Sequence, residues 1–157
     1  MGACGHEHHH GGLDAGALAT ELADAERRCT IADQKLTPPR RRVLELLLEA
    51  GQPVKAYDLI AAYSDGGAPA KPPTVYRALE FLSKQGFAHR IESLNAYVAC
   101  RRGEGGHAAA FLICDCCGAT REFASSATPF EALGDAAGYA LTGVTIEAHG
   151  LCADCRA

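Results

Sequence analysis

Two pairs of cysteines constrain the fold of this chain more than any other feature of its sequence. Cys114 and Cys117 form one pair, and Cys152 and Cys155 form the other. Each pair can form a tight turn that offers two thiolates to one ion, and two such turns complete the tetrahedral shell of a structural zinc. The 34 residues between the pairs exceed the usual spacing of about 15–20. A zinc ion there would join the end of a small domain to its beginning.

A redox-active dithiol is the alternative for such a pair, but it needs one pair ahead of a helix in a βαβ unit. Here a strand-like segment follows Cys117, and the spacing therefore favours structural zinc. Cys116 is interpreted as a spare thiol in the turn. Cys29 falls at an apolar helical position and is interpreted as a packed side chain, although redox sensing at either thiol stays open.

The composition is typical of a soluble globular protein with one ordinary domain or two small ones. The 157 residues are 48% hydrophobic and 22% charged, and no apolar run is long enough to cross a bilayer. The first residues, MGACGHEHHHGG, lack the apolar segment of a secretory signal, so we expect a cytoplasmic protein with reduced thiols. The net charge of −4 says little about a nucleic-acid partner, because local clusters carry that argument.

The first two thirds of the chain predict a winged helix-turn-helix over residues 13–100. Residues 1–12 form a His- and Gly-rich tail, which we expect to be flexible. Thr37 before two prolines predicts a capped helix start, and Gly51 predicts the end of the same helix. The pattern places helices around residues 18–29, 37–51, 56–63 and 72–86, a loop over 64–71, and strands over 87–92 and 96–100.

The last third predicts a small α/β domain over residues 107–157, after a hinge at residues 101–106. Its expected elements are strands at 110–114 and 119–123, a helix that opens with a capping box at Thr128, and a strand at 139–148. The fold class is therefore α+β, with a helical first domain and a mixed second domain.

A second group of metal-ligand residue types is scattered across the hinge. It comprises His89, Cys100, His107 and Glu122. Taken singly, each has an ordinary structural explanation: a locally bonded histidine, a small buried thiol or a solvated edge carboxylate. Spacing alone therefore does not establish a metal site in this group.

The segment AKPPTVYRALEFL has the pattern of a DNA-recognition helix. Its apolar residues would pack inward and leave Thr74, Tyr76 and Arg77 projecting near its N-terminal end, the end that enters the major groove. Lys71 precedes this helix, and further basic residues cluster at Lys35 and 40–42, where Arg40 is a candidate DNA contact. The alternative is that these charged residues lie on solvent-exposed helix faces and contact no DNA.

Linked motifs in this order resemble the ferric uptake regulator superfamily, and most closely its zinc uptake regulator branch. The motifs are LTPPRRRVLELL, AYDLI, PPTVYRALEFL, FAHRIES, YVAC, the first cysteine pair and EAHGLCADC, and the resemblance covers residues 17–155. It implies a dimeric metalloregulator with an N-terminal winged helix and a C-terminal dimerisation domain. It also implies that the two cysteine pairs hold structural zinc.

The resemblance turns the scattered group into an expected regulatory zinc site, with His89, Cys100, His107 and Glu122 as ligands and about two zinc ions per chain. It also implies DNA contacts at Tyr57, Tyr76 and Arg77. The expected function is a zinc-responsive repressor, not an enzyme. It would bind operator DNA as a homodimer and control zinc uptake and homeostasis genes, without a small-molecule substrate or a membrane partner.

Three alternatives remain open at this point. A family member could sense another metal or peroxide, but iron-sensing relatives carry a His-rich strand where this chain has GGHAAAFLIC. The thiolate of Cys100 also suits zinc better than harder ions. A small zinc enzyme would leave one ligand position open, and the sequence lacks HExxH or related motifs. A zinc store would depend on the His-rich tail.

Overall fold

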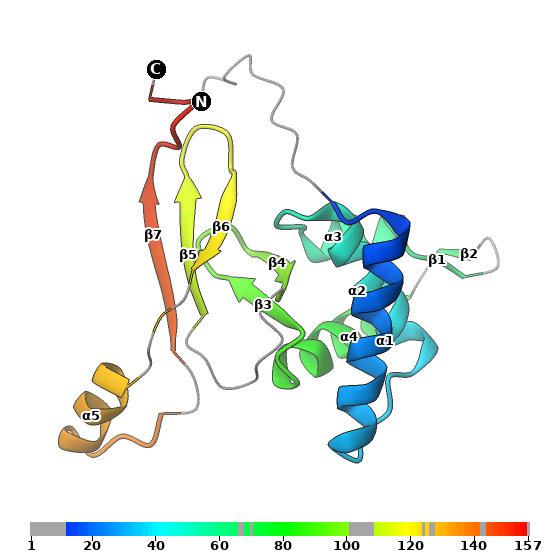
Figure 1. Cartoon of the computed structure of the whole chain (residues 1–157), viewed down its shortest axis with the longest axis horizontal. Helices are drawn as coiled ribbons and strands as arrows, with labels where there is room; N and C mark the ends of the chain where they lie inside the picture. Colours follow the sequence, from blue (N-terminus) through cyan, green and yellow to red (C-terminus); the bar gives the residue numbers. More distant parts are fainter. Residues whose placement is uncertain are drawn as a thin grey trace. The chain divides into compact units, whose positions relative to one another are not determined.

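The structure is a computed structural model that describes residues 12–65, 68–69, 71–100, 109–123, 125, 128–141 and 144–156. The described residues fall into two compact units, one formed by residues 12–100 and the other by residues 109–156 (Figure 1). The tail, the expected hinge and His107 lie outside the described residues, apart from Gly12.

Local capping signals set the ends of the first two helices. Helix α1 (Ala15–Ile31) begins after Asp14, whose carboxylate accepts a hydrogen bond from the N–H of Ala17 at 2.8 Å. Helix α2 (Pro38–Ala50) ends at Gly51, which adopts the expected left-handed conformation with φ 62°. The cap predicted at Thr37 is wrong in one respect. Thr37 occupies the N-cap position, but its side chain makes no capping hydrogen bond there.

Helices α3 (Ala56–Ala62) and α4 (Pro72–Lys84) follow, and the predicted apolar face of α4 is buried as expected. Val75, Leu79 and Leu82 are fully buried in the core of the first unit, together with side chains from α1, α2 and α3. This shared core holds α3 and α4 as a helix-turn-helix pair. The predicted loop between them contains two short paired strands, β1 (Ser64–Asp65) and β2 (Ala68–Pro69).

The wing is an antiparallel hairpin of β3 (Ala88–Ile91) and β4 (Ala96–Ala99), in agreement with the predicted pair of strands. Asn95 takes a positive φ of 46° in its turn, a conformation that Asn tolerates better than most residues. Val54 and Tyr97 exchange backbone hydrogen bonds of 2.8 Å, which tie the hairpin to the segment before α3.

The second unit is a three-stranded sheet with the order β6-β5-β7 (Figure 1). The central strand β5 (Ala109–Cys114) pairs antiparallel with β6 (Thr120–Phe123) and parallel with β7 (Thr145–Gly150). Helix α5 (Thr128–Ala136) lies on the connection from β6 to β7. The side chain of Phe111 in β5 is fully buried.

The last strand was predicted to begin at residue 139, and that boundary is wrong. The chain leaves α5 through a Schellman turn, in which Gly138 has φ 77° and the N–H of Tyr139 bonds to the carbonyl of Gly134 at 2.8 Å. Leu141 then folds back onto Gly134 so closely that a Cβ there would lie 2.8 Å from the Leu141 Cγ. The segment therefore closes the helix, and β7 starts at Thr145.

The predicted α+β class is confirmed, with a helical first unit that carries a two-stranded hairpin and a mixed second unit. Among the described residues, no helix has the length and hydropathy that a membrane crossing requires.

Candidate metal centre and nucleic-acid interface

The structure brings the sulfur atoms of both cysteine pairs together at one end of the β5–β7 sheet. All four sulfurs, from Cys114, Cys117, Cys152 and Cys155, lie within 4.8 Å of one another. The Cys117 and Cys152 sulfurs are 3.8 Å apart. Four sulfurs around one ion at the Zn–S distance of about 2.3 Å are separated by about 3.8 Å in a tetrahedron. The donor set and its spacing therefore fit a closed structural zinc site.

Backbone hydrogen bonds shape each cysteine turn. Cys114 ends β5, its N–H bonds to the carbonyl of Ala119, and its own carbonyl accepts from the N–H of Gly118, both at 2.9 Å. Gly118 has φ 74°, which lets the chain reverse after Cys117. In the second pair the N–H of Cys155 bonds to the carbonyl of Cys152 at 3.1 Å.

The two cysteines of the first pair differ in acidity. Backbone N–H groups of Cys117 and Cys152, with that of Cys116, lower the pKa of the Cys114 thiol to about 6, while burial acts in the opposite direction. The Cys152 N–H donates to the Cys114 sulfur at 3.3 Å. For Cys117 the Ala119 N–H lowers the pKa, but burial and the neighbouring Cys114 outweigh it, and the pKa is raised. Within the first pair, Cys114 is thus the thiol that ionises more readily.

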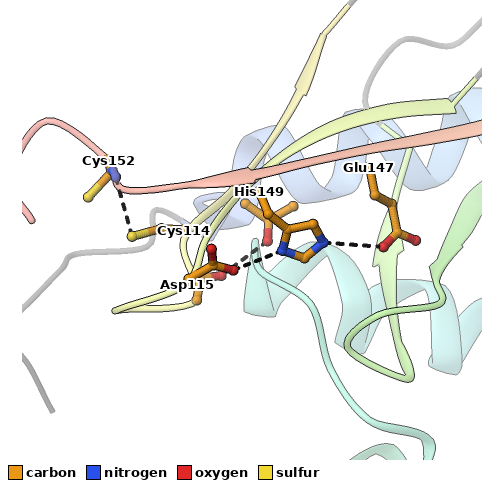
Figure 2. Close-up of polar contacts among 7 residues, drawn as sticks. Cys114, Asp115, Glu147, His149 and Cys152 are labelled. Atoms are coloured by element: carbon orange, nitrogen blue, oxygen red, sulfur yellow. Dashed lines mark hydrogen bonds and ion pairs between the residues drawn. The ribbon is translucent and has the colours of Figure 1, made fainter. Parts of the chain in front are cut away.

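A contact that the sequence interpretation missed ties the two cysteine turns together. The Nδ1 of His149 donates to a carboxylate oxygen of Asp115 at 2.8 Å, and its Nε2 lies 3.8 Å from a carboxylate oxygen of Glu147 (Figure 2). Asp115 directly follows Cys114, and His149 stands three residues before Cys152. The bridge therefore fastens the first turn to β7 just ahead of the second turn. The only sequence signal was the position of a histidine and an aspartate beside the cysteines.

Of the scattered ligand group, the first unit contributes two residues that lie close together. His89 is on β3 and Cys100 directly follows β4, and their ligand atoms lie within 4.8 Å of one another. The hairpin register pairs Ala88 with Ala99. His89 and Cys100, the residues that follow these two in the chain, therefore lie at neighbouring positions. Cys100 is buried, and His89 is partly buried. The pair offers one nitrogen and one sulfur, a donor set that suits zinc.

Glu122, the carboxylate of the same group, lies on β6 of the second unit. It stands opposite Phe111 in the β5–β6 register, and Phe111 in turn stands opposite Glu147 of β7. Glu122 is partly buried. The two carboxylates therefore occupy one row across the sheet, on either side of a fully buried aromatic residue.

The first unit exposes two tyrosines at the predicted DNA-reading positions. Tyr57, in the first turn of α3, is 77% exposed, and Tyr76 of α4 is 52% exposed. Among the described residues of this unit, Ile31 is the only other exposed large apolar side chain. Two exposed aromatic side chains on a helix-turn-helix are typical of a binding surface.

The N-terminal end of α4 can offer a ligand side-chain donors more readily than backbone N–H groups. Pro72 and Pro73 carry no N–H, and the N–H of Thr74 bonds to the carbonyl of Lys71 at 2.9 Å. Lys71 and Arg77 are exposed, and Thr74 is partly exposed. In the described part of the chain, neither cation has an ion-pair partner. These side chains are available to phosphates or base edges.

Arg40, the remaining candidate DNA contact, is engaged within the protein. Its guanidinium lies over the ring of Phe81 and donates a hydrogen bond to the carbonyl of Lys35. The other two arginines of the same run form ion pairs, Arg41 with Glu26 and Arg42 chiefly with Glu45. The basic cluster is therefore largely satisfied by its own unit.

Comparisons with known proteins agree with this architecture. The profile of the Ferric uptake regulator family matches residues 32–149. A "Zinc uptake regulation protein" of Escherichia coli K12 is 44% identical over 137 residues, which cover 85% of this chain and 80% of that protein, and a protein of the same name from Shigella flexneri matches equally.

Two solved structures are similar over most of both chains. The structure "Zinc Uptake Regulator Complexed With Zinc AND DNA" matches with a TM-score of 0.81 and 42% identity, over 88% of this chain and 95% of that one. "Crystal structure of holo XcZur" matches with a TM-score of 0.79 and 43% identity, over 87% and 97%. Family profile, sequence identity and fold agree, and this chain belongs to the ferric uptake regulator family.

Proposed function

We propose that this protein is a zinc-responsive transcriptional repressor that binds operator DNA as a homodimer and controls zinc uptake and homeostasis genes. The observation that carries the proposal is the likeness, at 42% identity over 88% of this chain, to a zinc uptake regulator solved with zinc and DNA. The exposed Tyr57 and Tyr76 and the four-sulfur cluster fit the same function. The protein acts in the cytoplasm, where its thiols stay reduced.

In this proposal the four-cysteine cluster holds a structural zinc. Such an ion supplies folding free energy to a domain whose core is small. The sheet of the second unit has only three strands, and the cluster joins the ends of two of them, β5 and β7. The second unit is the dimerisation domain, and the cluster maintains its sheet whether or not DNA is bound.

The regulatory zinc is held by His89, Cys100, His107 and Glu122. His89 and Cys100 come from the wing, while Glu122 comes from β6 of the second unit. A ligand set drawn from both units fixes the hinge at residues 101–106 and so sets the separation of the two recognition helices in the dimer. Zinc shifts the population of conformations toward the DNA-competent state, because it binds that state better than the other. DNA in turn raises the affinity for zinc by the same factor by which zinc raises the affinity for DNA.

DNA is read by α4 and by the start of α3. Arg77 bonds a base edge or phosphate, Tyr57 and Tyr76 make apolar base contacts, and Lys71 and Thr74 contact the backbone. The dimer places two such helices on half-sites about one helical turn apart. Repression follows when the dimer occludes a promoter.

The competing functions have less support. The relatives are named as regulators, not as enzymes, and the sulfur cluster offers a full set of four ligands, whereas a catalytic zinc keeps one position open. A metal or peroxide sensor of another type has no comparable relative at this identity among the matches described above. Deleting residues 1–12 separates a storage role from regulation, because a store would lose zinc stoichiometry while DNA binding persisted.

Fluorescence anisotropy of operator DNA against buffered free zinc tests the function directly. The operator is first identified by selecting bound duplexes from a random pool in the presence of zinc. Bound zinc per chain is counted in parallel. Binding should switch on as a second zinc ion per chain is loaded. DNA binding that does not depend on zinc, with one tightly held ion throughout, would overturn the sensing role.

Arg77→Ala should weaken operator binding by about 5-fold or more, since a bidentate base contact contributes about 1–3 kcal/mol. Zinc stoichiometry should not change, because Arg77 belongs to α4 and not to either ligand set. Lys84→Ala is the matched control on the same helix, as Lys84 is exposed in the last turn and paired with Glu80. Equal affinities of Arg77→Ala and wild type would remove Arg77 from the interface.

A further inference from the structure

The guanidinium of Arg40 makes two contacts at once, each with a different part of the first unit. Its central carbon lies 3.5 Å from the centre of the Phe81 ring. One of its terminal nitrogens donates a hydrogen bond to the carbonyl of Lys35 at 2.6 Å. Arg40 stands in the first turn of α2, Phe81 lies in the C-terminal half of α4, and Lys35 lies in the connection between α1 and α2.

The shape of arginine makes this combination possible. A planar guanidinium can stack its face on an aromatic ring while its N–H groups bond acceptors in its own plane, whereas an ammonium has no planar face to stack. Phe81 is 8% exposed and belongs to the core cluster. Arg40 therefore connects the recognition helix to the loop that precedes α2 through a largely buried ring.

A second stack of the same kind lies near the end of α4. The guanidinium of Arg28, from the last turn of α1, lies 4.4 Å from the ring centre of Phe87, which follows α4 and precedes β3. The C-terminal part of α4 and the residue leading into the wing are thus each covered by an arginine from another helix. The N-terminal part of α4, with Lys71 and Arg77, carries no such contact among the described residues.

We propose that Arg40 is a positioning residue for the recognition helix, which acts through its stack on Phe81 and not through a DNA phosphate. The proposal rests on the DNA-binding function proposed above. It assigns to Arg40 a role different from the DNA contact that the sequence suggested. The stack and the bond to Lys35 hold α4 at a fixed orientation relative to α1 and α2, so that Tyr76 and Arg77 meet the groove with the correct register.

Salt dependence separates a positioning residue from a phosphate contact. Loss of one phosphate contact lowers the slope of log K against log salt by about 0.9 and weakens binding to all sequences alike. Loss of a positioning residue leaves that slope unchanged. It weakens operator binding more than non-specific binding, because only base readout depends on the angle of the helix.

The experiment compares five proteins, each loaded with zinc: wild type, Arg40→Lys, Arg40→Met, Phe81→Leu and the double variant Arg40→Lys/Phe81→Leu. Anisotropy is measured on the selected operator and on a scrambled duplex over a range of salt concentrations. Arg40→Lys and Phe81→Leu should each weaken operator binding by about 3- to 10-fold with an unchanged slope. The double variant should be no weaker than the weaker single variant, since both changes break one interaction.

Several results would overturn the proposal. Wild-type affinity in Arg40→Lys would show that positive charge alone is enough, as at a phosphate. A slope lowered by about one in Arg40→Met would show the same. Additive losses in the double variant would show that Arg40 does not act through Phe81. Failure of the proposed function would look different, because then wild type itself would show no zinc-dependent operator binding.

Folding is checked on the same samples. Circular dichroism and zinc content should match wild type in Arg40→Lys, because Arg40 is only partly buried. If Phe81→Leu does not fold, Phe81→Tyr keeps a ring for the guanidinium and should retain wild-type affinity when Arg40 is present. Weakened operator binding in a folded Phe81→Tyr protein with intact Arg40 would contradict the proposal.

Discussion

Cys117→Ser should lose one tightly held zinc ion per chain and abolish the cooperative unfolding of the second unit. The Cys117 sulfur lies 3.8 Å from the Cys152 sulfur, and both belong to the four-sulfur cluster. Zinc bound by four cysteines supplies about 10–16 kcal/mol in small zinc domains, far more than a three-stranded sheet gains from its own core. Zinc content and thermal unfolding by circular dichroism measure the two losses.

Cys116→Ser is the matched control, because Cys116 sits directly before Cys117 but is not a member of the cluster. This variant should keep both the zinc ion and the wild-type melting curve. Cys117→Ser should also lose the dimer, and DNA binding should be lost with it. DNA binding should persist in Cys116→Ser. Retention of full zinc content by Cys117→Ser, or loss of zinc from Cys116→Ser, would show that the ligands have been assigned wrongly.

Cys100→Ser should lower zinc-induced operator binding by a factor of the order of 100, while the protein stays folded and keeps its structural zinc. Coupling between two ligands of a regulator typically changes affinity by about 5- to 150-fold, and loss of a thiolate ligand should remove most of it. Cys100 lies within 4.8 Å of the His89 ligand atom and outside the four-sulfur cluster. The measured zinc content should fall from about two ions per chain to about one.

Cys29→Ala provides the control for a second buried thiol. Cys29 is 1% exposed in the helical core, where burial raises the pKa of its thiol. Its replacement should lower the melting temperature and leave the zinc response of DNA binding intact. An unfolded product from Cys100→Ser would instead make the His89–Cys100 site structural. An unchanged zinc response in Cys100→Ser would exclude that thiol from sensing.

Much of the fold was predictable because its signals are local. Gly51 ends α2 as the sequence indicates, since a left-handed residue there requires little beyond its own backbone. Burial of Val75, Leu79 and Leu82 follows from their helical spacing. The start of β7 was not predictable in this way, because Gly134 and Leu141 decide it by packing across the turn after α5.

The sequence by itself predicted the four-cysteine cluster, because each pair forms a turn of its own and four thiolates complete one tetrahedral shell, while the parallel pairing of β5 with β7 brings the two turns together. It also determined which side of α4 projects, through the period of the helix. Only the tertiary structure decided that Arg40 stacks on Phe81 and that His149 bridges to Asp115 across 34 residues. Such pairs join segments far apart in the chain. No local pattern encodes them, and only the packing of helix on helix and strand on strand brings them together.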